Sequence, residues 1–167
     1  MSFLIRLLKP NDGADYRNLR LHALQNFPTY YGTSYEDAIK EDHVSFVKMI
    51  KKHNVFGAYL DKELSAIAIF AQAEGKHMEH YAHIYQVYVK KDKQSLGIGT
   101  KLMNAIIEHA KIKVRQIYIA VCTHNEAAIS LYKKLDFEIY GVEPKKLYIN
   151  NIYYDEYLMV KFFDKDR

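Results

Sequence analysis

The chain contains one cysteine, no tryptophan, three prolines and seven glycines. Because Cys122 has no second cysteine to pair with, an intramolecular disulfide is excluded, and nothing favours a disulfide-stabilised secreted protein. The most apolar stretch, residues 64–73, is too short to cross a bilayer, which requires about 20 residues. We therefore expect a cytoplasmic protein that does not insert into a membrane.

Neither sign of charge dominates, since 24 Lys and Arg residues stand against 20 Asp and Glu residues, a formal charge of +4 at pH 7. The basic residues are scattered and no groove-reading motif is present, so we expect no nucleic-acid partner. No linker, low-complexity tract or internal repeat interrupts the sequence, which predicts a single domain over residues 1–167. Aromatic residues are abundant, and fifteen Tyr and eight Phe can line a pocket as well as fill a core.

Hydrophobic periodicity predicts an α/β (α+β) fold with a mixed central sheet of six to seven strands flanked by about four helices. Strands are predicted at residues 4–9, 55–60, 64–73, 81–89, 117–121, 137–140 and 147–159. Helices are predicted at residues 13–25, 36–52, 100–111 and 123–135. Hairpin turns are expected at residues 61–63 and 150–151.

Local signals refine these elements. Asp12 is expected to cap the first helix, and Thr123 with Glu126 matches a capping box at the start of the last helix. The alternation along residues 81–89 predicts that one face of the strand carries His83, Tyr85, Val87 and Val89.

A glycine-containing loop, QSLGIG at residues 94–99, joins a strand to a helix. Glycines let a ligand approach the backbone, and the start of a helix offers unpaired N–H groups, so this arrangement suits a phosphate. A dinucleotide fingerprint would require a third glycine where Leu102 stands, and a P-loop would require Gly-Lys-Ser/Thr where Gly99 precedes Thr100. By itself the loop is equally compatible with an ordinary tight turn.

The spacing Gln94-x-x-Gly97-x-Gly99 between strand and helix resembles the acyl-CoA pyrophosphate loop of the GNAT superfamily of N-acetyltransferases. The sequence NEAAISLYKKLDF at residues 125–137 is similar to the second signature of that family. Asp136 replaces the usual glycine before the last Phe, at a helix end that favours left-handed geometry, which Asp tolerates. The predicted order of elements also matches that fold over nearly the whole chain.

The resemblance implies a cofactor, acetyl-CoA, with CoA as product, and transfer of the acetyl group to a primary amine by direct attack in a ternary complex. It also implies that two strands separate beside the cofactor and expose backbone groups to the pantetheine arm. The implied cofactor-binding residues are Val87, Tyr88, Val89, Gln94, Ser95, Leu96, Gly97, Ile98, Gly99, Thr100, Asn125 and Tyr132. Asn125 would bind either the pantetheine or the first turn of its own helix.

Two residues are candidates for proton transfer. Tyr132 stands where many members of the family carry the acid that protonates the departing thiolate. His83 stands on the fourth strand where several members place a carboxylate base, and either His83 or an ordered water would take the proton of the attacking amine. A partly buried, hydrogen-bonded histidine without a catalytic role is an equal alternative for His83. No His or Cys pair has convincing metal-ligand spacing, so we expect no metal.

The acceptor side is less specific. Residues 28–36 resemble a stretch that covers the acceptor site in one subgroup of the family, which makes Tyr31, Tyr35 and Glu36 candidate substrate-binding residues. Glu36 would hold an ammonium group or would only favour the start of a helix, and Asp155 and Glu156 would bind a cationic acceptor or face solvent. Lysines near both signatures would attract the CoA phosphates or act as ordinary surface charges: Lys90, Lys91, Lys93, Lys101, Lys133 and Lys134.

The resemblance leaves one alternative function open, a non-catalytic acyl-CoA-binding regulatory module. The amine is a small molecule or a peptide, and neither its identity nor the acyl-chain preference follows from the sequence. Dimers are common in the family, so a homodimer is compatible with the resemblance, but no interface is legible in the sequence.

Overall fold

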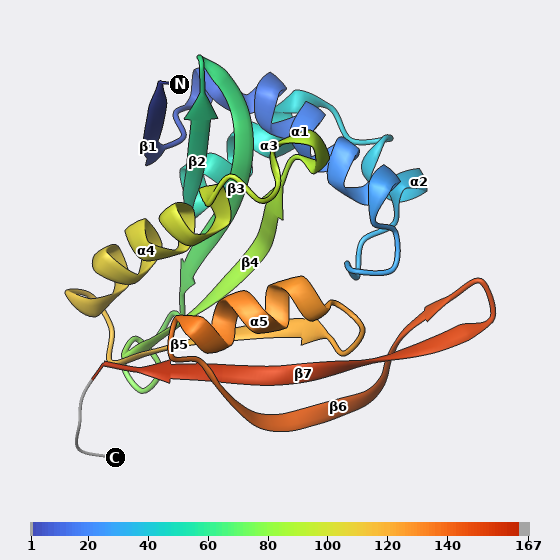
Figure 1. Ribbon diagram of the computed structural model, residues 1–167. Coiled ribbons are helices and arrows are strands. Elements are labelled where there is room, and N and C mark those ends of the chain that lie inside the picture. The colour runs from blue at the N-terminus through green and yellow to red at the C-terminus, as the bar shows by residue number, and fades with distance from the viewer. Residues whose placement is uncertain (1, 164–167) are drawn as a thin grey trace.

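The structure is a computed structural model that describes residues 2–163. A continuous seven-stranded sheet with the order β1-β2-β3-β4-β5-β7-β6 forms its centre (Figure 1). The strands are β1 (Phe3–Leu7), β2 (Asn54–Leu60), β3 (Glu63–Gln72), β4 (Tyr81–Val89), β5 (Gln116–Cys122), β6 (Glu138–Ile149) and β7 (Ile152–Phe162). The pair β4–β5 is parallel and the other neighbours are antiparallel, so the predicted mixed α/β sheet is confirmed.

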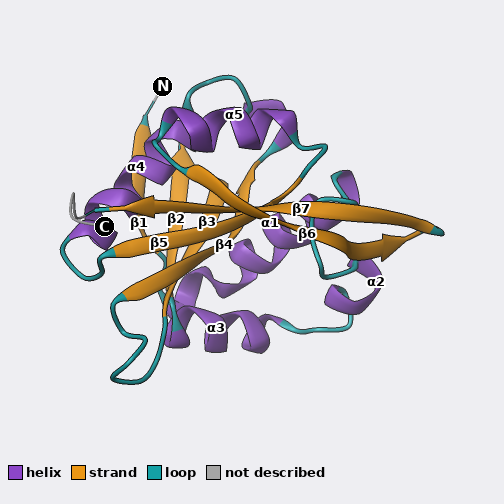
Figure 2. Ribbon diagram, turned by 90° about the horizontal axis from the view of Figure 1, so that it is seen from below, coloured by secondary structure: helices purple, strands orange, loops and turns teal. Residues whose placement is uncertain are grey.

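Helices cover both faces of this sheet (Figure 2). They are α1 (Gly13–Asn26), α2 (Tyr35–Ala38), α3 (His43–Lys52), α4 (Ile98–Lys111) and α5 (Glu126–Lys134), with 3-10 turns at Pro10–Asp12 and Lys91–Lys93. One hydrophobic core lies between β2–β5 and the pair α4 and α5, and a second lies between β2–β4 and the pair α1 and α3. Within residues 2–163, none of the helices combines the length and the apolar composition that crossing a membrane would require.

The predicted helix over residues 36–52 is broken into two pieces. Helix α2 ends at Ala38, and α3 begins anew at His43. Asp42 causes the break, because its carboxylate accepts hydrogen bonds from the amides of Val44 at 3.0 Å and Ser45 at 3.3 Å and so caps α3.

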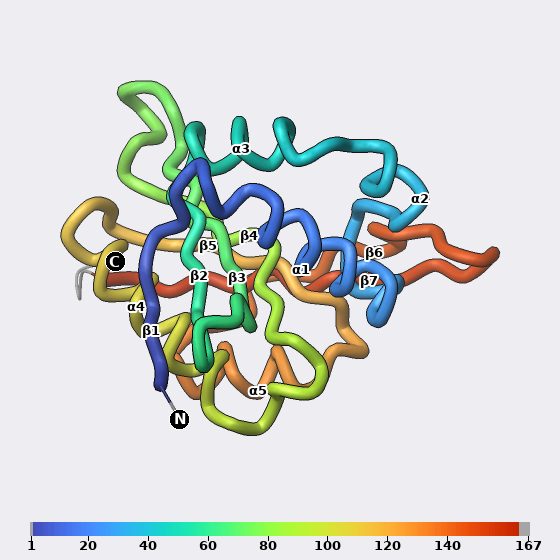
Figure 3. Tube along the Cα trace, turned by 90° about the horizontal axis from the view of Figure 1, so that it is seen from above, coloured from blue at the N-terminus to red at the C-terminus, as the bar shows by residue number. Residues whose placement is uncertain are grey.

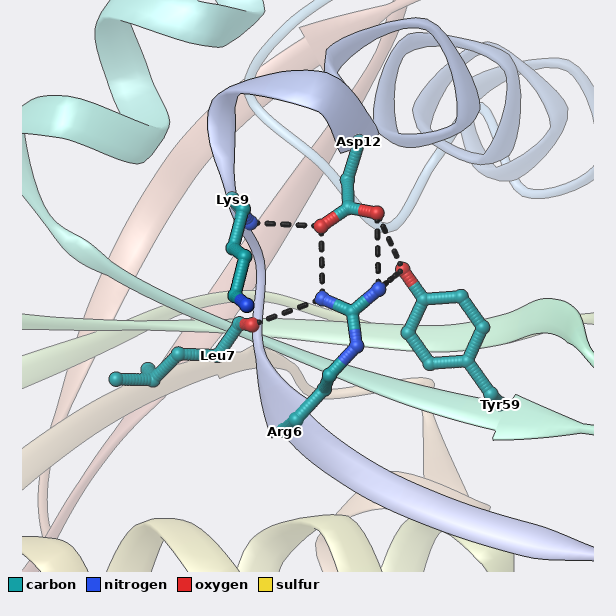
Figure 4. Close-up of polar contacts among 5 residues, drawn as sticks. All are labelled: Arg6, Leu7, Lys9, Asp12 and Tyr59. Carbon is teal, nitrogen blue, oxygen red and sulfur yellow. Dashed lines mark hydrogen bonds and ion pairs between the residues drawn. The ribbon is translucent and has the colours of Figure 1, made fainter.

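Asp12 does not cap α1, contrary to expectation. Its carboxylate instead forms two hydrogen bonds with the guanidinium of Arg6, at 2.7 and 2.9 Å, and accepts others from the Tyr59 hydroxyl at 3.0 Å and the Lys9 amide at 2.7 Å (Figure 4). The Arg6 guanidinium holds the pKa of Asp12 down at about 2, and it lies 4.4 Å from the centre of the Tyr59 ring. This cluster ties β1, the turn before α1 and β2 together.

The start of α5 also differs from the prediction. The cap is Asn125 and not Thr123, since the Asn125 side chain accepts a hydrogen bond from the Ala128 amide at 3.3 Å. Helix α5 therefore begins at Glu126, and the capping-box interpretation is wrong.

Strand β4 carries a bulge in its second half. Ile69 pairs with Tyr85 and Ile67 pairs with Tyr88, so two residues of β4 lie opposite a single residue of β3. Gln86 occupies the bulge with a φ of +54°, a left-handed conformation that non-glycine residues rarely adopt.

The bulge reverses the faces of β4 from one half to the other. His83 lies opposite Ala71, which belongs to the core under α1 and α3, whereas Val87 and Val89 pack against the core under α4 and α5. The expectation that His83 shares a face with Val87 and Val89 is therefore wrong, because the extra residue shifts the alternation by one.

The C-terminal strands form a long hairpin that projects beyond the helices (Figure 1). Its turn is Asn150-Asn151 as predicted, with φ values of +50° and +63° that fit a two-residue type I′ turn. Strand β6 is a 12-residue element, longer than the predicted 137–140, and register shifts interrupt its pairing with β7. Figure 3 places the connection between α1 and α2 beside this hairpin.

Candidate functional site

The strands β4 and β5 pair only over three residues each, the last pair being His83 and Tyr118. Beyond that pair the two strands separate, which confirms the expected gap in the sheet. A cavity of about 960 Å³ occupies the gap, and its walls come from both faces of the sheet. The α4–α5 side contributes the glycine loop and α5, and the α1–α3 side contributes residues of α1, the connection before α2 and the strands β4 to β7.

The glycine loop leads into α4 and faces the cavity. Gly97 is the cap of α4 with a φ of +76°, and a Cβ atom added there would meet no atom within 4 Å. Ser95 also has a positive φ, of +66°. Within residues 2–163, the first backbone amide after Gln94 that donates to the chain is that of Lys101, to the carbonyl of Gly97 at 3.1 Å. The loop therefore presents open amides at the positive end of a helix dipole, which is an anion-binding arrangement.

Most residues that the sequence predicted to bind the cofactor line this cavity. They are Val87, Tyr88, Val89, Gln94, Ser95, Gly97, Ile98, Gly99, Thr100, Asn125 and Tyr132. Leu96 is exposed and lies outside the lining found within residues 2–163. Tyr88 also reaches α1, where its hydroxyl is 2.7 Å from Nδ1 of His22.

The free edge of β4 is partly occupied by side chains. The Tyr31 hydroxyl donates to the carbonyl of Val87 at 3.1 Å, and the Gln94 amide donates to the carbonyl of Val89 at 3.1 Å. The expectation that this edge is fully unpaired therefore needs correction. A ligand that pairs with these carbonyls has to displace the two side chains.

Tyr132 lies on α5, directly against the cavity. Its ring is buried, with 4% of its surface exposed, and burial raises the pKa of its hydroxyl well above the ordinary value. The end of α5 fixes this side chain: Phe137 N–H donates to the Tyr132 carbonyl at 3.0 Å, Asp136 N–H donates to Lys133, and the Phe137 ring centre is 5.9 Å from that of Tyr132. Asp136 has the predicted left-handed conformation, with a φ of +64°.

Asn125 lies at the opposite end of α5. Its carbonyl oxygen accepts from the first turn of the helix, which is one of its two predicted roles, and the residue also lines the cavity. Because the side-chain amide nitrogen is a separate donor, capping the helix does not prevent Asn125 from donating to a ligand.

His83 lies among aromatic rings on the wall of the cavity. Its ring stacks on Tyr85 with centres 5.6 Å apart and lies 5.4 Å from Tyr118 and 5.7 Å from Tyr81. Burial lowers its pKa below the ordinary 6.5, so the neutral imidazole predominates at pH 7. Within residues 2–163 the ring has no hydrogen-bond partner, and it lines the cavity together with Tyr85 and Tyr118.

The three candidate substrate residues separate in the structure. Tyr31 lines the cavity, whereas the lining found within residues 2–163 includes neither Tyr35 nor Glu36. Tyr35 and Glu36 lie in the first turn of α2, where Glu36 is exposed, so its position matches the alternative of a helix-start residue. Of the two acidic candidates on β7, Glu156 lines the cavity, and Asp155 accepts a hydrogen bond from the Lys145 amide at 2.7 Å.

The predicted lysine cluster contributes little to the cavity. Lys93 lines it, whereas Lys90 forms an ion pair with Glu63 and Lys101 lies over the Phe3 ring at 4.6 Å. Within the described part of the chain, no three His, Cys, Asp or Glu side chains group in a way that could hold a metal ion.

Sequence reasoning missed several residues of the wall, notably Arg20 and Cys122. Cys122 lies on β5, where burial raises the pKa of its thiol to about 11 and its Sγ is 3.2 Å from the Thr29 carbonyl. Arg20 had a signal in the sequence, because it interrupts the apolar helical spacing of Tyr16, Leu19 and Ala23 on α1. A lone arginine within an otherwise apolar stripe marks a charge that the fold buries.

Comparison with known proteins identifies a family to which this chain is similar. The model of the acetyltransferase (GNAT) family matches residues 17–137, a segment that includes the glycine loop and Tyr132. A putative acetyltransferase of Salmonella typhimurium, solved with its cofactor acetyl-CoA, superposes with a TM-score of 0.87 at 17% identity over 100% of this chain and 97% of its own. At that identity the likeness concerns the fold.

Two relatives are similar in sequence. An uncharacterised N-acetyltransferase of Methanocaldococcus jannaschii is 28% identical over 143 residues, which are 82% of this chain and 61% of the relative. An L-methionine sulfoximine/L-methionine sulfone acetyltransferase of Pseudomonas aeruginosa is 36% identical over 62 residues, 36% of each chain. The aligned part of this chain thus spans less than two thirds of either relative.

Proposed function

The chain belongs to the GNAT family of acetyltransferases, and from that premise we propose that it transfers the acetyl group of acetyl-CoA to a primary amine. A single observation carries the proposal: one cavity connects the open amides at the start of α4, the gap between β4 and β5, and the buried hydroxyl of Tyr132. A phosphate-bearing acyl donor and an amine can enter such a cavity from opposite faces of the sheet.

The chain's own residues fit the acyl donor. The open amides around Gly97 suit the pyrophosphate, and the absence of a Cβ atom there lets phosphate oxygens approach the backbone. When bound, acetyl-CoA supplies an acetyl thioester whose carbonyl carbon is open to attack. The β4 edge at Val87–Val89 offers main-chain groups to the pantetheine amides once the Tyr31 and Gln94 side chains release its carbonyls.

Tyr132 is proposed as the general acid. The amine nitrogen forms a C–N bond to the acyl carbon, the C–S bond breaks, and the electron pair leaves with sulfur. The Tyr132 hydroxyl then donates its proton to that sulfur, and the nitrogen, positively charged after attack, returns a proton to the tyrosinate directly or through water to leave the neutral amide. The raised pKa keeps the Tyr132 hydroxyl protonated at neutral pH, which a proton donor requires.

His83 is proposed as the base, directly or through an ordered water. An alkylammonium has no free electron pair, so it must lose a proton before attack. The lowered pKa of His83 keeps its imidazole neutral at pH 7, and the residue lies on the α1–α3 side of the gap, from which the amine would enter.

The first experiment measures thiol release from acetyl-CoA against a broad panel of amines. Wild type, Tyr132→Phe and the exposed-tyrosine control Tyr153→Phe are assayed in parallel. Acceptor-dependent release that fails in Tyr132→Phe alone supports an N-acetyltransferase. Binding of acetyl-CoA without release for any small or peptide amine would instead support the non-catalytic acyl-CoA-binding module.

We also propose a domain extent, a cellular location and an acceptor class for this activity. Residues 1–167 act as one N-acetyltransferase domain in the cytoplasm, on a small-molecule or peptide amine and not on nucleic acid. Expression of residues 1–167 alone with retained activity tests the domain, and cell fractionation tests the location. A homodimer stays a prediction that light scattering in solution can test.

A further inference from the structure

Arg20 is a charged residue buried without a partner. Only 5% of its surface is exposed, and within residues 2–163 none of its guanidinium nitrogens has a hydrogen-bond acceptor or a carboxylate in reach. Its Nη1 atom is fully buried and unsatisfied. The guanidinium lies over the Tyr31 ring, whose centre is 4.5 Å from the Arg20 Cζ atom.

Such a residue is costly to the fold. A guanidinium carries five N–H donors and keeps its charge at all physiological pH values. Removing it from water without an anionic partner opposes folding, which is why buried charges in proteins are normally paired. An arginine kept in this state on the wall of a cavity is therefore best explained by a partner that arrives with a ligand.

Gln86 is a polar neighbour of Arg20 on the cavity wall. The Tyr16 hydroxyl donates to Oε1 of Gln86 at 2.7 Å, and the Gln86 amide nitrogen is a separate donor. Gln86 and Thr33 line the main cavity together with Arg20. These three residues also line a side cavity of about 180 Å³, so the guanidinium lies in the wall that the two cavities share.

The acidic residues that line the two cavities do not form an ion pair with Arg20 within the described residues. Glu41 lines only the side cavity, within the described residues, and is exposed. In the main cavity Glu143 pairs with Lys146 at 2.9 Å, and Glu156 lies on β7, on the far side of the gap from α1. An acceptor that spans the cavity would therefore meet a cation at Arg20 and a carboxylate at Glu156.

We propose that Arg20 binds a carboxylate of the acceptor, and that the acceptor is an amino acid or a close analogue with a free carboxylate near its amine. This inference rests on the proposed acetyltransferase function. A carboxylate matches the fork of the guanidinium and accepts two parallel hydrogen bonds from it. A polycationic amine would be repelled by Arg20.

The test compares three forms of each acceptor: the free amino acid, its carboxamide and the decarboxylated amine. We expect wild type to acetylate the free acid with a kcat/KM about 100-fold above that of the other two forms. Arg20→Met should remove that preference by raising KM for the acid, with an unchanged KM for acetyl-CoA. Arg17→Met is the matched control, since Arg17 lies on the same helix and, among the described residues, its side chain donates only to the carbonyls of Ile39 and Glu41.

Thermal shift separates the possible failures. The free acid should raise the Tm of wild type and of Arg17→Met but not of Arg20→Met, whether or not acetyl transfer is detected. Equal turnover of acid and carboxamide would overturn the carboxylate site while leaving the acetyltransferase intact. A folded Arg20→Met variant that keeps the full preference for the free acid would also overturn it, in favour of a purely structural role.

Discussion

His83 and Tyr118 form the last register pair between β4 and β5, and their rings lie 5.4 Å apart at the point where the strands separate. The pair closes one end of the gap, and the cavity opens beyond it. His83 thus combines a fixed ring position with a lowered pKa, which are the two properties a base at this gap requires.

The position of His83 predicts the acid limb of the pH profile. Burial lowers the pKa, so His83 stays neutral at pH 7 and becomes protonated only as the pH falls below its ordinary value of 6.5. We expect kcat/KM to fall as the pH drops through this lowered pKa, and His83→Gln to lose both most of the rate and this limb. Exposed His80, replaced in the same way, serves as control. An unaltered profile in His83→Gln would assign the base to a water or to another residue.

Tyr132→Phe should lower kcat by about 100-fold or more, which is the lower range for loss of general acid catalysis. The ring contact with Phe137 is retained, and within residues 2–163 the hydroxyl has no hydrogen bond to lose, so Tm should change little. Steady-state kinetics and thermal melting measure the two effects. A variant with wild-type kcat would remove Tyr132 from the chemistry.

Substitutions at Gly97 can distinguish two requirements of the glycine loop: a left-handed backbone conformation and space for phosphates beside the backbone. Gly97→Ala places a Cβ at a φ of +76° and should destabilise the protein by about 1 kcal/mol, whereas Gly97→Asn should cost less because Asn tolerates this conformation. If phosphates approach the backbone here, both variants raise KM for acetyl-CoA. Rescue of KM by Asn would show that only the backbone conformation matters.

Asp136→Gly should stabilise the protein by about 0.5–1 kcal/mol, because glycine adopts the left-handed conformation of residue 136 without strain. The ion pair lost with Lys161, at 3.4 Å, involves a carboxylate that is 87% exposed and contributes little. Denaturant unfolding measures the gain. Asp136→Ala is the opposite control and should lower stability.

The Arg6–Asp12 pair predicts a pH-dependent stability. Because the folded pKa of Asp12 is about 2 against an ordinary 3.8, its contribution is full above pH 3.8 and is lost as the pH falls towards 2. Asp12→Asn should lower the free energy of unfolding at pH 7 by about 2 kcal/mol. The free energies of unfolding of the two proteins should therefore converge as the pH is lowered from 7 to 2, and a constant difference would contradict the assignment.

Periodicity and turn chemistry predicted most of the sheet. The span 81–89 and the Asn150-Asn151 turn follow from local sequence, the left-handed Asp136 follows from the family signature, and the structure confirms all three. The misplaced features have non-local causes. Asp12 caps no helix because Arg6 and Tyr59, from two strands, compete for its carboxylate.

The site was less predictable for a related reason. Gln86 in the bulge accepts a hydrogen bond from Tyr16 of α1, a contact that the pattern within β4 does not contain, and the alternation of β4 alone placed His83 and Val87 on one face. The partial loss of free edge groups has the same origin, because Tyr31 reaches β4 from the connection before α2. The family's motifs were enough to predict the positions of the glycine loop and Tyr132. The cavity wall on the α1–α3 side consists of segments that are distant in the sequence, so no local motif predicts it.

The gap between β4 and β5 also affects the tendency of the protein to aggregate. Where two strands separate, each becomes an edge, and an exposed edge invites pairing with the strand of another molecule. Tyr31 and Gln94 occupy the carbonyls of Val87 and Val89 and so act as gatekeepers against such pairing in the unliganded protein. We expect the double variant Tyr31→Phe, Gln94→Ala to aggregate faster than wild type on gentle heating, and saturating acetyl-CoA to suppress that aggregation by occupying the same edge.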